Sequence, residues 1–134
     1  MFAYWRGFAF ESGEIWGVDT ILLAYDTKHL YIGEIEKAFV ESLKGYSRFL
    51  TELGVIPPYE WIAGLTGIKG RQLLIPLPHG QMRVPGWPGP ECLSDTVTAE
   101  GFFDPAQAPS SVLLRFFETI YNKCGVPRPD YLPR

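Results

Sequence analysis

Apolar side chains near the start of the chain recur with a period of two. Between residues 2 and 11, aromatic residues occupy alternate positions, which is the pattern of a strand with both faces at least partly covered. A Ser-Gly turn signal follows this segment. The apolar stretch over 15–25 is therefore expected to contain a second strand that pairs back on the first.

The period changes to steps of three and four between Gly33 and Leu53. Apolar residues then recur on one face while charged residues occupy the others, which predicts an amphipathic helix. Gly54 stands where a C-terminal cap requires a positive φ. The Pro57-Pro58 pair that follows prevents the helix from continuing.

Three later segments, 59–66, 71–75 and 93–103, alternate again and are predicted strands. Only a short glycine-containing stretch separates the first two, so we expect them to form a β-hairpin. Residues 76–91 hold five of the twelve prolines, and we expect a stiff loop there because proline lacks the donor that a central strand needs.

The chain ends in a predicted second helix and a tail. Pro109 suits the first turn of a helix, and the apolar stripe from Val112 to Tyr121 has helical spacing. Residues 126–134 contain three prolines and should be extended. We predict a single α+β domain over 1–134, with an antiparallel sheet of about five strands, two helices packed on one face and the order β-β-α-β-β-β-α.

Length and composition support this fold and narrow the functions. A chain of 134 residues fits one domain, and its 46% hydrophobic and 15% aromatic residues exclude a disordered tail. The net charge of −3 gives no basis for direct nucleic-acid binding, and the twelve Lys and Arg are scattered along the chain. No apolar run is long enough to span a membrane.

The cysteines and the N-terminus bear on the compartment. Cys92 and Cys124 are too few for a disulfide framework, so we expect two buried thiols, with a single bridge between them as the alternative. The first residues lack the basic start and plain apolar run of a signal peptide. The expected location is therefore the cytoplasm.

The sequence contains no recognisable catalytic or metal-binding motif. His29 and His79 have no partner at a metal-ligand spacing, no CxxC or HExxH occurs, and no GxSxG marks a nucleophile. Acidic residues such as Asp95 and Glu100 are expected to be solvated. We predict no cofactor, no metal and no catalytic residue, and we lean against an enzyme.

Tryptophans and arginines are the candidates for binding. Trp87 lies in the proline-rich loop, where it either anchors a partner or folds back over the core. An arginine in an apolar cleft can hold an anion, which makes Arg6 and Arg71 candidates. The residues we expect to bind a ligand or partner are Trp5, Arg6, Trp16, Trp61, Arg71 and Trp87.

Three stretches of the chain together resemble one family. Residues 2–11 resemble its aromatic-aromatic-Arg strand, 53–59 and 65–70 its LGVxPPY and LxGVRGY segment, and 93–100 with 113–125 its closing strand and final helix. This pattern is similar to the C-terminal region of bacterial AlbA/Schlafen-type DNA-binding, ATP-binding proteins. The resemblance implies an accessory domain without catalytic residues, because the nucleic-acid function of such proteins is assigned to an N-terminal part.

These observations predict a non-catalytic module that binds a small molecule or a protein partner and that could self-associate. The resemblance implies that it works beside a DNA-associated bacterial protein. The alternative is a small α+β enzyme that acts on an anionic small molecule in a cleft between sheet and helices. In that case Arg6 or Arg71 would hold the anion and a nearby carboxylate would be the base.

Overall fold

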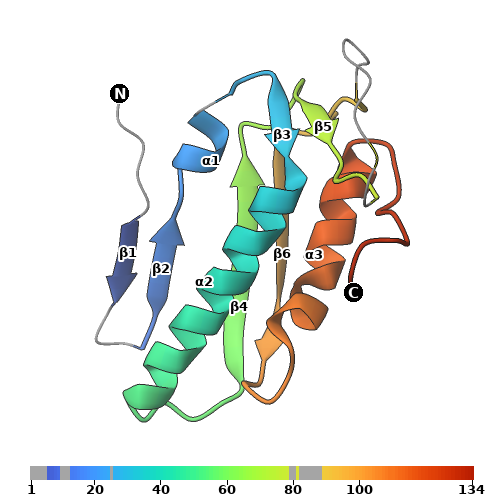
Figure 1. Cartoon of the computed structure of the whole chain (residues 1–134). Coiled ribbons are helices and arrows are strands. Elements are labelled where there is room, and N and C mark those ends of the chain that lie inside the picture. The colour runs from blue at the N-terminus through green and yellow to red at the C-terminus, as the bar shows by residue number, and fades with distance from the viewer. Residues whose placement is uncertain (1–5, 10–12, 25, 79–80, 82–88) are drawn as a thin grey trace.

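The computed structural model of the chain describes residues 6–9, 13–24, 26–78, 81 and 89–134. Helices are interspersed among the strands along this part of the chain (Figure 1). In chain order they are β1 (Arg6–Ala9), β2 (Ile15–Val18), α1 (Ile21–Ala24), β3 (His29–Tyr31), α2 (Ile32–Glu52), β4 (Tyr59–Thr66), β5 (Gln72–Leu74), β6 (Thr96–Phe103) and α3 (Pro109–Lys123).

The described strands pair two by two. β1 pairs with β2 and β4 pairs with β6, both in antiparallel orientation, and Tyr59 lies opposite Phe103 at one end of the β4–β6 ribbon. β3 and β5 are parallel, with Leu30 opposite Leu73. The α+β class is confirmed, but a single antiparallel sheet of about five strands is not, because each described sheet has two strands.

The hairpin predicted from 59–66 and 71–75 is wrong. β4 pairs with β6, and β5 pairs with β3. Gly67 and Gly70 both have a positive φ, and between them the side chain of Ile68 is fully buried. Because Ile68 is buried, the chain turns toward the core after β4. β5 therefore does not fold back on β4 and pairs with β3 instead.

The segment over 15–25 contains the predicted second strand, because β2 pairs back on β1. This strand ends at Val18, and the short helix α1, which was not predicted, follows. The polar connection after it already contains the start of β3 at His29. β3 has three residues, and only Leu30 of them is buried, so no alternating pattern marks it in the sequence.

Both long helices form where the pattern predicts them and end in the same way. After α2, Val55 N–H donates to Leu50 O and Gly54 N–H to Thr51 O, each at 3.0 Å. This is a Schellman motif, in which the residue after the cap takes a positive φ that glycine adopts without strain. Gly54 has φ +82°, as predicted, and Gly125 after α3 has φ +79°.

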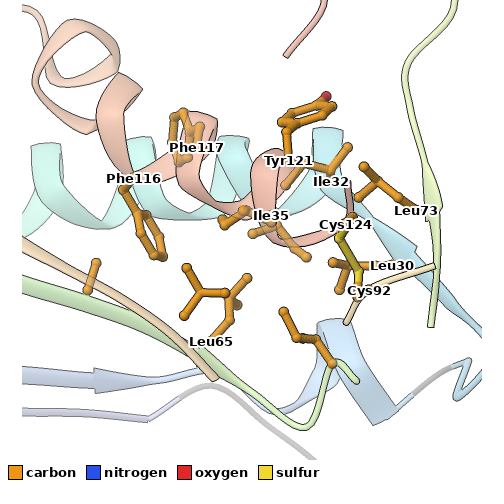
Figure 2. Packing of buried hydrophobic residues seen from close by; sticks show 14 of the residues in the cluster. Leu30, Ile32, Ile35, Leu65, Leu73, Cys92, Phe116, Phe117, Tyr121 and Cys124 are labelled. Carbon is orange, nitrogen blue, oxygen red and sulfur yellow. A yellow bond between two sulfur atoms is a disulfide. The ribbon is translucent and has the colours of Figure 1, made fainter. Parts of the chain in front are cut away.

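The core lies between the β4–β6 ribbon and the two long helices. α2 and α3 lie on the same side of this ribbon (Figure 1). Phe39 of α2 meets Phe116 of α3 edge to face, with ring centroids 4.9 Å apart. Figure 2 shows the buried side chains around this contact, which include Leu30, Ile32, Ile35, Leu65, Leu73, Phe116, Phe117 and Tyr121.

A disulfide joins Cys92, before β6, to Cys124 at the end of α3 (Figure 2). Both residues are buried, as predicted, but the expectation of two free thiols is wrong. Leu93 N–H donates to Lys123 O at 3.0 Å, which holds the two segments side by side. The bridge therefore follows from tertiary packing, which the spacing of two cysteines in a sequence does not reveal.

The tail over 126–134 runs back from the end of α3 without a helix or strand (Figure 1). Val126 and Leu132 pack partly buried against the core. Of the proline-rich loop over 76–91, residues 79–80 and 82–88 lie outside the described residues. Within the part of the chain that is described, no helix has the length and apolar character needed to cross a membrane.

Candidate functional site

The C-terminal tail brings Arg128 back to α2, where it meets Glu36. The Arg128 Nε and Nη2 atoms donate to the same carboxylate oxygen, Glu36 Oε1, at 3.0 and 2.7 Å. The side chain of Arg128 is 10% exposed and that of Glu36 is 12% exposed. The two charge-assisted hydrogen bonds link the tail to α2. Removal of either partner alone would leave a buried charge uncompensated.

This ion pair does not use all of its hydrogen-bonding capacity. Among the described residues, no hydrogen bond reaches Glu36 Oε2 or leaves Arg128 Nη1. A carboxylate accepts through both oxygens, and a guanidinium donates through five N–H groups. The pair therefore presents a free acceptor close to free donors, although its charges cancel.

A groove with a volume of about 350 Å³ runs past this pair. It lies between α2, α3 and the tail, and Glu36 and Arg128 are part of its wall. Val40, Phe117 and Leu132 supply apolar surface from the same three segments. The volume lies within the range of small-ligand sites, and the walls combine apolar surface with a few polar groups, although the groove is open rather than enclosed.

A smaller hollow of about 190 Å³ adjoins the groove, because Gly33 and Pro76 line both. Its other lining residues are Tyr31, Glu34 and Leu74. A Cβ atom at Gly33 would lie 3.0 Å from Pro76 Cγ, which is tighter than ordinary packing. Glycine at this position therefore lets the segment after β5 approach the start of α2, where the two hollows meet.

Tyr121 places an unpaired hydroxyl near the ion pair. The residue is fully buried, and its hydroxyl has no hydrogen-bond partner among the described residues. Burial raises the pKa of this phenol, and the negative charge of Glu36 raises it further. Figure 2 shows the oxygen pointing away from the strands and out of the cluster of buried side chains. Buried polar groups are normally paired, so the unpaired hydroxyl costs stability, and Tyr121 lines neither of the two hollows.

Removing this hydroxyl is expected to stabilise the ligand-free protein. Tyr121→Phe keeps the ring but removes a buried group without a partner, so we expect the free energy of unfolding to rise by about 1 kcal/mol. Tyr59→Phe is the matched control, because its hydroxyl bonds Thr51 Oγ1 and Val55 O, each at 2.8 Å. That variant should lose about 1 kcal/mol. Urea unfolding measures both, and a loss in Tyr121→Phe would show that its hydroxyl is paired.

A second polar cluster surrounds Asp26 in the turn before β3. Asp26 Oδ2 accepts hydrogen bonds from His29 Nδ1 at 2.7 Å and from the Tyr31 hydroxyl at 2.9 Å. Asp26 Oδ1 accepts from the backbone N–H groups of Lys28 and His29. These bonds, first that from Lys28 and then that from the His29 ring, hold the pKa of the Asp26 carboxyl well below its usual range.

The Asp26 cluster predicts a particular response to acid. A depressed pKa adds stability above about pH 4, the unfolded value, and this stability is lost as the pH falls. The difference in stability between wild type and Asp26→Asn should therefore shrink between about pH 5 and pH 2. Thermal melts across this range measure it. A difference for Asp26→Asn that stays constant across this range would contradict the prediction.

Arg71 stabilises the same turn from the other side. Its Nη1 donates to the backbone oxygens of Leu23 at 2.9 Å, Asp26 at 2.6 Å and His29 at 3.5 Å. Its Nε donates to Gly67 O at 2.9 Å. These contacts give Arg71 a role in the fold, and it lines neither hollow. They lend no support to the enzyme alternative, in which this arginine would hold an anion.

Of the two histidines expected to be isolated, His29 belongs to this cluster and His79 lies outside the described residues. The spacing Asp26-Thr-Lys-His29 is the signal that could have indicated the contact, because an aspartate often bonds the backbone two residues on. Across the described part of the chain, no group of three or more His, Cys, Asp or Glu side chains could hold a metal ion. The cluster is a carboxylate that orients one imidazole.

The structure places two of the predicted tryptophans apart from the groove. Trp16 on β2 is exposed. Trp61 is partly buried against the core, and a Cβ atom at Gly101 on the neighbouring strand would lie 3.0 Å from its Cζ2. Neither lines the groove or the hollow. Trp5, Trp87 and the side chain of Arg6 lie outside the described residues, so their predicted roles stay predictions.

The two residues of the ion pair and the nearby Tyr121 were not among the predicted site residues. Glu36 looks like any charged residue on the polar face of a helix, and Arg128 lies 92 positions later between two prolines. Tyr121 belongs to the apolar stripe of α3 and is expected there as a core residue. Only folding brings these three side chains together, and no local motif in the sequence announces it.

Comparison of the chain with protein-family models, with curated proteins and with solved structures finds no match. The similarity to AlbA/Schlafen-type proteins therefore stays a prediction. The fold and the groove define a class in structural terms: a small α+β protein with a ligand-sized groove that holds a buried ion pair.

Proposed function

We propose that the chain is a non-catalytic module that binds a small, mostly apolar molecule in the groove between α2, α3 and the tail. The observation that carries this proposal is the buried Glu36–Arg128 pair in the groove wall. Its unused carboxylate oxygen and guanidinium nitrogen can recognise a ligand by hydrogen bonds. The apolar surface of Val40, Phe117 and Leu132 would cover the rest of the ligand.

The chemistry of the pair favours an uncharged ligand group. Because Glu36 and Arg128 neutralise each other, a carboxylate would meet Glu36 as a like charge, and an ammonium would meet Arg128. A primary carboxamide offers a donor and an acceptor side by side, which matches a free carboxylate oxygen next to free guanidinium N–H groups. The expected ligand is therefore a compact apolar body that carries a carboxamide or a group of the same pattern.

A matched series of probes tests this preference. Phenylacetamide, phenylacetate and phenethylamine share one ring and differ in the polar group. We expect the amide to raise the melting temperature most, because a ligand at ten times its Kd stabilises by about 1.4 kcal/mol. Equal effects of the three probes, or no effect of any, would refute the proposal.

The control variant replaces both charges of the pair. Glu36→Leu with Arg128→Met should remain folded, because removing both partners leaves no unpaired buried charge. It should bind phenylacetamide at least about tenfold more weakly, a loss of about 1.4 kcal/mol. If the double variant binds the amide as well as the wild type does, the pair does not recognise the ligand.

The setting of the module is also a proposal. We infer a role beside a DNA-associated bacterial protein from the family resemblance, and we propose the cytoplasm as the location of the module. The Cys92–Cys124 disulfide argues against that location, because the cytosol keeps most thiols reduced. Acid quenching of the cells, followed by alkylation of the unfolded protein, decides between the two, because both cysteines are buried in the fold. Labelled cysteines would support the cytoplasm, and unlabelled ones an oxidising compartment.

A further inference from the structure

The side of the β4–β6 ribbon that faces away from α2 and α3 carries two large apolar side chains. Ile62 on β4 is 75% exposed and Phe102 on β6 is 67% exposed. The register places Ile62 opposite Glu100 and Phe102 opposite Glu60. Apolar and acidic side chains therefore alternate across the two strands, and we call these four residues the acidic-apolar face.

The charge along the two strands and at one end of the ribbon has one sign. Residues 49–66 and 96–114, which include both strands and the connections at the end where β4 begins and β6 finishes, contain four acidic residues and no Lys or Arg, whereas Lys69 follows β4 at the other end. Two of the four, Glu60 and Glu100, belong to the face itself, and Glu52 and Asp104 lie in the flanking segments. A partner that covers Ile62 and Phe102 must therefore also neutralise neighbouring carboxylates.

The apolar character extends to one end of the ribbon. Leu53 and Ile56, in the connection between α2 and β4, are both exposed. Figure 1 shows this connection at the end of the ribbon where β6 finishes, which is the end that carries Phe102. Exposed apolar residues gathered at one place are characteristic of interaction sites, whereas scattered single ones are ordinary.

We propose that the acidic-apolar face binds a basic segment of a partner protein in which Lys or Arg alternates with apolar side chains. A second copy of the chain fits poorly, because two such faces would bring Glu60 and Glu100 of one copy against those of the other. The groove is lined by residues of α2, α3 and the tail and by no residue of β4 or β6, so this inference does not depend on the small-molecule ligand.

Peptides of defined composition test the proposal on the whole chain. A peptide of repeated Lys-Ser-Leu-Ser units places Lys and Leu in alternation on one side of an extended strand. Peptides with Glu in place of Lys, or Ser in place of Leu, remove one feature each. Fluorescence anisotropy should show the Lys-Leu peptide binding at least about tenfold more tightly than either, with an affinity that falls as salt is added.

Variants locate the binding. Ile62→Ser with Phe102→Ser, and separately Glu60→Gln with Glu100→Gln, should each weaken binding of the Lys-Leu peptide at least about tenfold. The matched controls are Leu93→Ser and Glu91→Gln, which change an exposed leucine and an exposed glutamate outside the face and should leave binding unchanged.

NMR shifts and sedimentation complete the test of the binding site. Backbone amide NMR shifts induced by the peptide should concentrate in β4 and β6, which also covers the case of a variant that folds poorly. Equal binding of the Lys and Glu peptides, or shifts concentrated elsewhere, would overturn the proposal. So would a dimer in sedimentation that is lost in Ile62→Ser with Phe102→Ser, because it would assign the face to a second copy.

Discussion

Replacement of Arg128 by methionine is expected to lower the free energy of unfolding by about 3–5 kcal/mol. The change leaves Glu36 with a carboxylate that is 12% exposed and has lost the two hydrogen bonds from Arg128. An uncompensated buried charge is among the most destabilising outcomes of a single substitution. Urea unfolding at neutral pH, with the slope checked for constancy, measures the loss.

Two controls separate this effect from the loss of any arginine. Arg134→Met breaks an ion pair to Asp130 at 3.7 Å whose side chains are 70% and 98% exposed, and it should change stability very little. Adding Glu36→Leu to Arg128→Met should recover most of the lost stability, because no buried charge then remains. If Arg128→Met behaves like Arg134→Met, the ion pair is not buried in solution.

Reduction of the Cys92–Cys124 disulfide is expected to cost about 3–4 kcal/mol. The bridge spans a sequence separation of 32, and a closed loop of that length restricts the unfolded chain by about this amount. Unfolding in urea with and without a thiol reductant measures the difference. The variant with Cys92→Ala and Cys124→Ala should unfold identically under both conditions.

The thiol count gives an independent check of the bridge. The chain has two cysteines, and both take part in the disulfide. Unfolded, unreduced protein should therefore take up no alkylating reagent, and reduced protein should take up two equivalents. Two equivalents without reductant would contradict the bridge and would favour two buried thiols instead.

Elements set by local signals were predictable from the sequence. α2 and α3 have an apolar stripe of helical period, and Gly54 and Gly125 end them with positive φ. These features depend on residues within one or two turns. The alternation that predicted β4 and β6 likewise depends on near neighbours, and their burial patterns alternate as expected.

Strand pairing and the groove were not predictable in this way. β3 is three residues long and pairs in parallel with β5 across the whole of α2 and β4, so no turn signal links them. Glu36 carries no sign in the sequence that its partner will be Arg128 rather than water. The tryptophans can be selected as candidates from their residue type alone, whereas the residues of the groove can be recognised only from their positions in the folded structure.

The contact between Trp61 and Gly101 has a consequence for how this sequence can vary. Because the indole fills the space beside β6, bulk at position 101 would have to be offset by a smaller residue at position 61. The side chains at positions 61 and 101 fill the same space between the two strands, so one can grow only if the other shrinks. Among related sequences they should therefore change together, so that a lineage that loses this tryptophan is free to lose the glycine, and one that keeps it is not.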